Sequence, residues 1–577
     1  MPVHNADIAA AFRRLADLLE IEGGNPFRVR AYRTAAVTVA GLPRDAAAML
    51  ADGADLSELP GIGDDLAGKI AEMVETGSLH LLEEIETRVP PGLSDMTRLP
   101  GLGPKRVKAI HDALGIDSLE ALARAARNGR LRALPGFGAK TESRILEELG
   151  RYQGAERRLR LIDAEHVAGP LLDYVRAIDG VKRAVVAGSY RRQKETVGDL
   201  DILVTAADGK AVIGRFVAYE EVGNIASQGT TRSTVILGSG FQVDLRVVPE
   251  ESYGAALFYF TGSKAHNIAL RKLAIANGWK LNEYGLFEGA TRIAGRTEEE
   301  IYAKLALPFI APPLREDRGE VEAARKGALP NLVTLADIRG DLHCHTTASD
   351  GRYSVREMAE AAQKKGYAYL GITDHSKSQA VAGGMSEDEL AAQIDEIDAL
   401  NGEFRDFRVL KSCEVDILPD GRLDFPDSLL ARLDYTVCSI HGAFNLSREK
   451  QTARVLRAMD NPHFTIFGHA TGRLINERPA YDIDLERIMR EAKERGCYLE
   501  LNAQPSRLDI DDIHCRIARD IGLKVPISTD AHTVDGLEMM RYGIAQAGRG
   551  WLEAKDVLNT LPLDDLLKAF ERKDAGS

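Results

Sequence analysis

The central part of the chain is organised around Gly188-Ser189-Tyr190-Arg191-Arg192-Gln193-Lys194-Glu195-Thr196-Val197-Gly198-Asp199-Leu200-Asp201. Two aspartates one residue apart end this stretch, and the apolar run Ile202-Leu203-Val204 follows them. The pattern predicts a strand that carries both carboxylates on one face. Carboxylates ~4 Å apart repel each other by roughly 4 kcal/mol at an effective dielectric constant of about 20, so a fold that keeps them together needs a cation between them. Because every ligand atom would be oxygen, Mg²⁺ is the expected ion.

Two further features complete a candidate site for nucleotidyl transfer. Gly188-Ser189 predicts a turn whose backbone N–H groups face phosphate oxygens, and Arg192 supplies positive charge beside it. Asp244 supplies a third carboxylate within Gln242-Val243-Asp244-Leu245-Arg246-Val247, whose alternation predicts a strand beside the first. A single Asp-x-Asp is more often a solvated strand end. The turn, the arginine and a third aspartate in this order favour a two-metal site.

These residues resemble the catalytic palm of the family X DNA polymerases, which carries the same Gly-Ser…Arg…Gly-Asp-x-Asp run. The resemblance implies that the catalytic metal ligands are Asp199, Asp201 and Asp244. It also implies that the nucleotide triphosphate contacts Ser189, Arg192 and Gly198. The expected reaction is attack of a primer 3′-hydroxyl on the α-phosphate of a dNTP across two Mg²⁺ ions.

The next informative segment is Tyr259-Phe260-Thr261-Gly262-Ser263-Lys264-Ala265-His266-Asn267, followed by Arg271. By itself it predicts a strand, a turn and a helix, with the aromatic rings in a core. It is also similar to the thumb of the same family, which implies that the nucleotide-binding residues include Tyr259, Phe260, Gly262, Lys264, Asn267 and Arg271. In that resemblance the two aromatic rings pack beside the nucleotide, while Asn267 and Arg271 approach the minor groove. Lys264 departs from the acidic residue of eukaryotic members, and a cation there would meet the triphosphate before DNA binds.

An internal repeat precedes the palm. Its three copies are Leu59-Pro60-Gly61-Ile62-Gly63, Leu99-Pro100-Gly101-Leu102-Gly103 and Leu134-Pro135-Gly136-Phe137-Gly138. Helical runs are expected after them at Asp64–Val74, Pro104–Leu114 and Ala139–Leu149. One such turn would be mere helix punctuation, but three in series resemble helix-hairpin-helix motifs, which bind DNA backbone phosphates without reading sequence. The DNA-binding residues implied are Gly61, Gly63, Gly101, Gly103, Gly136, Gly138 and Lys69.

Lys69 has a second interpretation. In eukaryotic members of the family, the N-terminal domain removes a sugar-phosphate remnant through a lysine Schiff base, and Lys69 matches that lysine. Tyr32 and Arg28 match residues that hold the 5′-phosphate. Asp64 and Asp65 depart from the family pattern, and a lysine in this motif more often only contacts phosphate. Lyase chemistry and simple phosphate contact therefore both stay open.

The last part of the chain carries histidines and carboxylates at predicted strand ends. In Asp341-Leu342-His343-Cys344-His345, the two histidines alternate along a strand and share a face, as a metal pair requires, whereas Cys344 points to the opposite face and is expected in the core. Helical stretches alternate with the strands, which predicts a β/α barrel with metals at its C-terminal mouth. The segment resembles the polymerase-and-histidinol-phosphatase (PHP) domain, a distorted β/α barrel with a trinuclear metal site. That resemblance implies nine metal ligands: His343, His345, Asp350, His375, Glu414, His441, His469, Asp530 and His532.

Whole-chain properties set the broader expectations. The chain has 577 residues, 44% of them hydrophobic and 28% charged, which is ordinary for a multidomain globular protein. The net charge of −13 argues mildly against a nucleic-acid partner, although local basic groups such as Arg151, Arg157, Arg158 and Arg160 matter more. No signal peptide or membrane span is expected, and five unpaired cysteines suit a cytoplasmic location.

The expected fold is multidomain: an α-helical N-terminal region, an α+β nucleotidyltransferase palm with a thumb, and a distorted β/α barrel. The expected segments are 1–90 (helical, first hairpin), 91–150 (fingers-like), 151–252 (palm), 253–312 (thumb), 313–336 (linker) and 337–577 (PHP domain).

The resemblance implies gap-filling DNA synthesis in base excision repair, with metal-dependent 3′–5′ hydrolysis of DNA ends. Mg²⁺ is expected in the palm and up to three Mn²⁺ or Zn²⁺ ions in the PHP site. The partners would be gapped or nicked duplex DNA and dNTPs, with no membrane, and the protein would be a monomer. Two other hypotheses remain: a DNA-end-binding scaffold with vestigial sites, and a small-molecule phosphatase that binds DNA.

Overall fold

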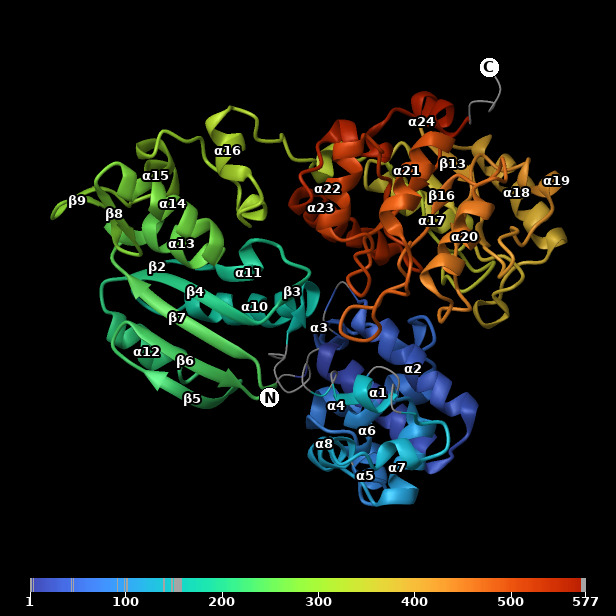
Figure 1. Cartoon of the computed structure of the whole chain (residues 1–577), viewed down its shortest axis with the longest axis horizontal. Coiled ribbons are helices and arrows are strands. Elements are labelled where there is room, and N and C mark those ends of the chain that lie inside the picture. Colours follow the sequence, from blue (N-terminus) through green and yellow to red (C-terminus); the bar gives the residue numbers. More distant parts are fainter. Residues whose placement is uncertain are drawn as a thin grey trace.

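The computed structural model describes residues 3, 5–42, 44, 46–90, 92–97, 99, 102–138, 141–146, 149 and 158–571. Figure 1 shows three groups of elements: a helical N-terminal region, a sheet from the middle of the chain with the helices that follow it, and a C-terminal barrel. The fold class expected from the sequence is confirmed.

The N-terminal region is a helical assembly around one apolar core. On α1 (Asn5–Glu22), Ile8, Phe12, Leu15 and Leu19 recur at helical spacing, and all four are buried. The remaining elements are α2 (Pro26–Ala40), α3 (Ala46–Ala51), η1 (Leu56–Glu58), α4 (Asp64–Thr76), α5 (His80–Glu86), α6 (Gly92–Thr97), α7 (Pro104–Leu114), α8 (Leu119–Arg127) and η2 (Leu131–Ala133). Two of the helices expected after hairpin turns are therefore present as α4 and α7. Of the third, residues 141–146 are helical, and part of the expected range lies outside the described residues.

The palm is a five-stranded sheet in the order β2-β4-β7-β6-β5. Its strands are β2 (Val181–Val186), β4 (Asp199–Ala206), β5 (Val222–Gln228), β6 (Arg232–Leu237) and β7 (Gln242–Val248). Strands β4 and β7 run parallel, and their register sets Asp201 opposite Asp244. Around the sheet lie α10 (Leu161–Arg176), α11 (Gly188–Arg191), α12 (Gly209–Phe216) and the two-stranded pair β1 (Leu159–Arg160) and β3 (Thr196–Val197). The two predicted strands of the catalytic triad are thus confirmed as neighbours.

The thumb contains α13 (Tyr253–Thr261), α14 (Lys264–Ala276), β8 (Trp279–Asn282), β9 (Gly285–Glu288), β10 (Thr291–Ala294) and α15 (Glu298–Lys304), with η3 (Glu250–Ser252) before them. The strand considered at Tyr259-Phe260 is wrong, because both residues lie in the last turns of α13. The helix is apolar on most sides and buried, so its short terminal run carries no helical periodicity that sequence analysis can recognise. Gly262, with φ of 68°, ends it.

The segment expected as a linker, 313–336, is well structured. It contains α16 (Glu320–Arg325) and η5 (Leu335–Asp337), and η4 (Pro312–Leu314) precedes it. Leu314, Val321 and Ala324 are buried in the same core as the thumb helices. Trp551 of the C-terminal region completes this core, so the segment joins the thumb to the barrel.

The C-terminal region is a barrel of short parallel strands. They are β11 (Gly340–Asp341), β12 (Tyr369–Ile372), β13 (Arg408–Lys411), β14 (Glu414–Asp416), β15 (Val437–Ser439), β16 (Ile466–Phe467), β17 (Tyr498–Leu499), β18 (Leu501–Asn502) and β19 (Ile527–Ser528). Single parallel bridges, His375 to Glu414 and Cys344 to Ala531, link the separate sheets, and the second joins the first part of the barrel to its last. The structure thereby closes the cylinder that the alternating pattern predicts.

Helices surround this barrel: α17 (Val355–Lys364), α18 (Glu387–Asn401), α19 (Asp427–Leu430), α20 (Arg448–Ala458), α21 (Leu485–Arg495), α22 (Asp512–Ile521), α23 (Met540–Arg549) and α24 (Leu563–Phe570), with short turns η6 (Ala380–Ala382), η7 (Val534–Met539), η8 (Ala554–Asp556) and η9 (Leu558–Thr560). Within the described residues, no helix is both long and apolar enough to cross a membrane. All five cysteines are buried free thiols.

Candidate active sites

Three carboxylates meet at the palm sheet. Asp199 and Asp201 project from β4 and Asp244 from the adjacent β7, with one oxygen from each lying within 4.8 Å of the others. Burial and the charges of Asp199 and Asp244 raise the pKa of Asp201 to about 7. Such mutual repulsion is what a bound divalent cation relieves, and the all-oxygen donor set fits Mg²⁺.

Three neighbours of the triad show how the sequence builds it. Thr234 Oγ1 and Gln242 Nε2 donate to Asp244 over 2.5 and 2.7 Å, which orients that carboxylate. Gly188 has φ of 61°, and a Cβ atom there would lie 2.6 Å from Asp201 Oδ2. Glycine is therefore required, because the backbone of α11 must approach the carboxylate closely.

A cavity of about 540 Å³ opens between the palm and the thumb. It is lined by Arg158, Gly188, Ser189, Arg192, Lys194, Asp199, Asp201, Tyr259, Phe260, Gly262, Lys264, Asn267, Ile268 and Arg271. Carboxylates stand at one part of its wall and cations at another, as a metal-bound triphosphate needs. The structure thus brings together all but one of the nucleotide-binding residues expected from the sequence; Gly198 is not part of this lining, although it directly precedes β4.

Two cationic lining residues were not predicted as nucleotide ligands. Arg158 had been noted only as part of a basic cluster, and Lys194 lies inside the quoted central stretch without a role. Of the rest of that cluster, Arg160 is buried in an ion pair with Asp163, and Arg151 and Arg157 lie outside the described residues. Membership of a basic cluster was the only signal for Arg158.

The thumb side of the cavity is held by contacts among its own residues. Asn267 Nδ2 donates to the Tyr259 carbonyl over 2.7 Å, and the Arg271 guanidinium lies 5.1 Å from the Tyr259 ring centre. Tyr259 and Phe260 meet edge to face at 5.1 Å. These contacts fix the aromatic wall without any ligand. Lys264 is exposed at the first turn of α14.

The hairpin glycines occupy turns ahead of helices. Gly61 and Gly136 have φ of 67° and 81°, values that favour glycine. Gly63 and Gly103 directly precede α4 and α7. Gly138 lies two residues after Gly136 in the third hairpin turn, and Gly101 of the second turn lies outside the described residues.

The Lys69 amine is held in an ion pair, whereas a lysine that forms a Schiff base needs an unpaired, uncharged amine. Its ammonium pairs with Asp65 one turn earlier on α4. Tyr32, expected to hold a 5′-phosphate, is buried at 1% exposure, whereas Arg28 is exposed beside it. Among the described residues, the Tyr32 hydroxyl has no hydrogen-bond partner.

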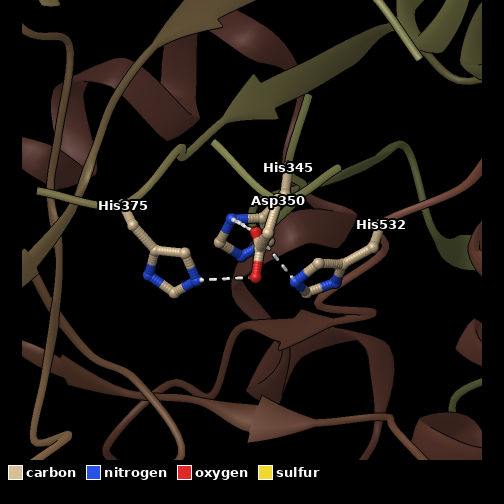
Figure 2. Close-up of side chains that lie close together, drawn as sticks. All are labelled: His345, Asp350, His375 and His532. Atoms are coloured by element: carbon tan, nitrogen blue, oxygen red, sulfur yellow. Dashed lines mark ion pairs between the residues drawn. The ribbon is translucent and has the colours of Figure 1, made fainter. Parts of the chain in front are cut away.

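The nine residues expected as PHP metal ligands converge at the C-terminal mouth of the barrel. Figure 2 shows one group, in which Asp350 faces three histidines. Its oxygens lie 3.3 Å from His532 Nε2, 3.5 Å from His375 Nε2 and 3.7 Å from His345 Nδ1. Three imidazoles and one carboxylate this close together could coordinate a single metal cation.

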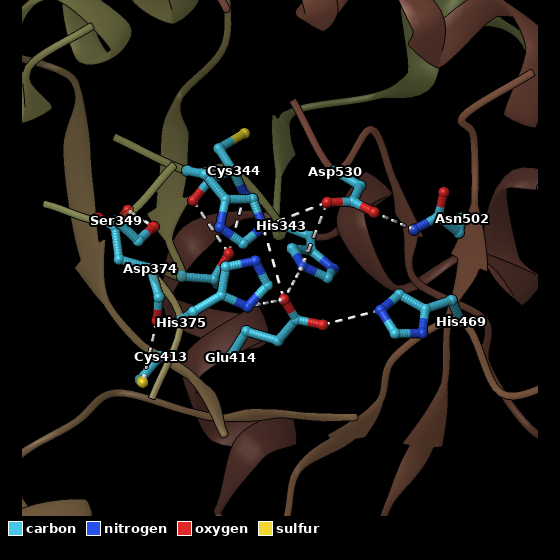
Figure 3. A network of polar contacts seen from close by, with 12 residues as sticks. His343, Cys344, Ser349, Asp374, His375, Cys413, Glu414, His469, Asn502 and Asp530 are labelled. Atoms are coloured by element: carbon cyan, nitrogen blue, oxygen red, sulfur yellow. Dashed lines mark hydrogen bonds and ion pairs between the residues drawn. The ribbon is translucent and has the colours of Figure 1, made fainter. Parts of the chain in front are cut away.

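Glu414 stands at the centre of the rest of the cluster (Figure 3). His469 Nε2, His375 Nδ1 and His441 Nε2 approach its oxygens to 2.8, 2.9 and 3.2 Å. A further group consists of His343, His345 and Asp530. Three overlapping groups of possible ligands therefore share His345 and His375.

Buried nitrogen atoms test whether a metal fits this cluster. Among the described residues, His343 Nε2, His345 Nδ1 and His469 Nδ1 are buried without a hydrogen-bond partner, and His345 Nε2 and His375 Nδ1 meet carboxylate oxygens of Asp530 and Glu414 as ion pairs without hydrogen-bond geometry. A buried polar group left unpaired costs about 1–3 kcal/mol, and bound cations would give these nitrogens partners. Although burial opposes ionisation, the surrounding histidines hold the pKa values of Glu414 and Asp530 well below the usual range. The donor set fits divalent transition metals.

Residues behind the ligands were missed by sequence analysis. Glu500 Oε1 lies 2.7 Å from His343 Nδ1, and its Oε2 accepts the backbone N–H of His469 over 2.8 Å. Asp416 lies 3.2 Å from His441 Nδ1. Such carboxylates orient ligand imidazoles and fix their tautomers. A signal existed for Glu500, since it interrupts the apolar strand run Tyr498-Leu499-Glu500-Leu501. Cys344 is buried in the hydrophobic core, where it was expected.

Comparisons with protein families agree with this geometry. The "DNA polymerase beta palm" model matches residues 163–230 and the "DNA polymerase beta thumb" model matches residues 256–316. A "Helix-hairpin-helix domain" matches residues 3–79, and a "SAM-like Helix-hairpin-helix tandem" matches 93–151. The "PHP domain" model matches residues 341–504.

Individual proteins extend the comparison to the whole chain. The DNA polymerase/3'-5' exonuclease PolX of Bacillus subtilis (strain 168) is 38% identical over 576 residues, which are 99% of this chain and 100% of that protein. DNA polymerase lambda of Rattus norvegicus is 30% identical over 45% of this chain and 48% of its own length. A probable phosphatase of Thermoanaerobacter sp. (strain X514) is 28% identical over 41% of this chain and 97% of its own length.

Proposed function

Because the chain belongs to the family X DNA polymerases that carry a C-terminal PHP domain, we propose that it fills short gaps in duplex DNA and trims DNA 3′ ends at a second metal centre. The observation that carries the proposal is the cavity between palm and thumb, where Asp199 and Asp201 of the carboxylate triad face the same space as several arginines and lysines. That arrangement matches a metal-bound triphosphate better than any neutral ligand.

In synthesis, Asp199, Asp201 and Asp244 would hold Mg²⁺, which lowers the barrier by stabilising charge on the attacking and leaving oxygens. Ser189 and Arg192 bind the triphosphate, and the Tyr259–Phe260 wall supports the sugar and base. Gln242 and Thr234 keep Asp244 oriented, so that its carboxylate is ready for a metal.

In end hydrolysis, the nine-residue cluster would hold up to three Mn²⁺ or Zn²⁺ ions, whose chemistry is to make a hydroxide near neutral pH. Glu500 and Asp416 hold His343 and His441 in the orientation that ligation needs. Histidine-rich sites favour such ions over Mg²⁺, so the two centres differ in the metal that they select.

The biological setting we propose is short-patch base excision repair by a monomer in the cytoplasm, acting on gapped or nicked DNA. Lyase chemistry at Lys69 would require its amine to leave Asp65 and lose a proton, whereas 5′-phosphate docking would not. Borohydride trapping on a 5′-deoxyribose-phosphate end tests the lyase reaction directly.

One gapped duplex with a labelled primer tests both activities. The Asp201→Ala variant should lose primer extension and keep end degradation, and His343→Ala should do the reverse. Extension by Asp201→Ala at the parent rate would refute the palm assignment. A parent protein that binds the duplex but neither extends nor shortens it would instead indicate a scaffold, and phosphate release from small phosphoesters without end trimming would indicate a phosphatase.

A further inference from the structure

The segment that precedes the catalytic strand β4, residues 188–198, contains α11 and β3 and contacts the C-terminal domain. Arg549, the last residue of α23, is buried at 3% exposure. Its Nη1 donates to the Arg192 carbonyl over 3.0 Å and to Glu316 Oε1 over 2.9 Å. Its Nη2 pairs with Asp512 over 2.7 Å. One arginine of the barrel therefore joins the palm, the segment after the thumb and its own domain.

Glu316 connects this arginine to the nucleotide cavity. The oxygen that accepts from Arg549 also accepts from Arg192 Nε over 2.9 Å, and Arg192 lines the cavity. Although burial opposes ionisation, the Arg192 and Arg549 guanidiniums hold the pKa of Glu316 below its usual value. Arg192 Nη1 donates to the Thr261 carbonyl of the thumb. The position of Arg192 is thus set by contacts from outside the palm.

The other two cations that the palm contributes to the cavity wall, Arg158 and Lys194, have similar anchors. Asn476 of the barrel donates to the Arg158 carbonyl over 2.9 Å. Beside Lys194, Glu195 pairs with Arg473 over 2.7 Å and accepts from Gln546 over 3.3 Å. Each of the three palm cations that line the cavity, Arg158, Arg192 and Lys194, is therefore itself held by the C-terminal domain or adjoins a residue that is.

We propose that the C-terminal domain is part of the polymerase nucleotide site, in which Arg549 and Asn476 are positioning residues that hold Arg192 and Arg158 toward the triphosphate. This inference rests on the proposed synthesis activity. Guanidiniums bind phosphate through directed hydrogen bonds, so affinity depends on holding them in place before the ligand arrives. Without Arg549, Arg192 would be the one remaining arginine paired with Glu316, and Glu316 would then compete more strongly with the triphosphate for that guanidinium.

The test is single-turnover insertion of one dNTP by the full-length protein, which separates the dNTP dissociation constant from the maximal rate. Arg549→Gln should raise the dissociation constant about tenfold, equivalent to ~1.4 kcal/mol, with little change in maximal rate. Folding should tolerate the change, because Glu316 keeps Arg192 and Asp512 keeps Arg318 as partners. Arg549→Lys should restore part of the affinity, since it keeps the charge. End degradation in Mn²⁺, measured on the same samples, should stay at the parent level.

The matched control is Arg541→Gln on the same helix. Arg541 also crosses to the palm, where it pairs with Glu165 of α10 over 2.9 Å, but no residue of α10 lines the cavity. Nucleotide affinity should not change in this variant. An equal loss in Arg541→Gln would show a general effect of domain docking and would overturn the positioning role.

A second variant keeps the test decisive if Arg549→Gln does not fold, which loss of end degradation would reveal. Asn476 is exposed and has φ of 66°, a conformation that glycine adopts freely, so Asn476→Gly removes the donor to Arg158 without adding a charge. It should raise the dNTP dissociation constant severalfold. Parent affinity in Asn476→Gly, and in Arg549→Gln if that variant folds, would refute the inference, whereas a parent protein without any insertion would refute the proposed function itself.

Discussion

The Mg²⁺ requirement of synthesis should depend steeply on pH because of one buried carboxylate. Burial and the charges of Asp199 and Asp244 raise the pKa of Asp201 to about 7 in the metal-free protein. Only the ionised carboxylate binds a cation, so protonation competes with Mg²⁺. With that pKa, roughly one tenth of Asp201 is ionised at pH 6 and roughly nine tenths at pH 8. The Mg²⁺ concentration that gives half-maximal synthesis should therefore be about tenfold higher at pH 6 than at pH 8.

The measurement is primer extension over a series of Mg²⁺ concentrations at each half pH unit from 5.5 to 8.5. Reading the half-saturating concentration rather than the maximal rate separates metal binding from the pH dependence of chemistry. The curve should fall about fivefold from pH 6 to pH 7 and about twofold from pH 7 to pH 8, and flatten above that. Arg246, whose positive charge lowers the pKa of Asp201, offers a matched variant: Arg246→Gln should move the bend to higher pH. A half-saturating concentration that differs by less than about twofold between pH 6 and pH 8 would refute the reasoning.

Three further predictions concern the other sites. DNA affinity should be insensitive to sequence and should fall on the order of 10³-fold between 50 and 200 mM salt, as six or so phosphate contacts require. Gly61→Val or Gly136→Val should weaken DNA binding. A clear preference for one duplex in filter binding would contradict this prediction. Calorimetry with Mg²⁺–dNTP and no DNA should detect binding that Lys264→Asp weakens roughly tenfold or more, because the change reverses a charge at the cavity; unchanged affinity would leave Lys264 as a surface cation. End degradation should be weak in pure Mg²⁺ and rise sharply with Mn²⁺, whereas synthesis should proceed with either ion. His343→Ala or His532→Ala should abolish degradation and leave synthesis unchanged. Degradation that survives in both variants would place the nuclease elsewhere.

Several local features were predictable from sequence because their signals are short. The helix expected at Pro104–Leu114 has those bounds as α7, since a proline begins it and Gly115 ends it. The pairing of β4 with β7 followed from two alternating runs that each carry an aspartate. By contrast, the helix Tyr253–Thr261 gives no periodic signal, because apolar residues surround it on most sides.

By itself, the sequence determined the order of domains and the residues at strand ends that converge on each candidate metal centre. This is possible because a strand positions its side chains by alternation, and a parallel barrel brings all its strand ends to one mouth. Only the tertiary structure decided which groups stand behind those residues. Glu500 behind His343, and Arg549 behind Arg192, come from positions 157 and 357 residues away along the chain. Such contacts depend on how whole domains pack, and no local pattern of residue types records that packing.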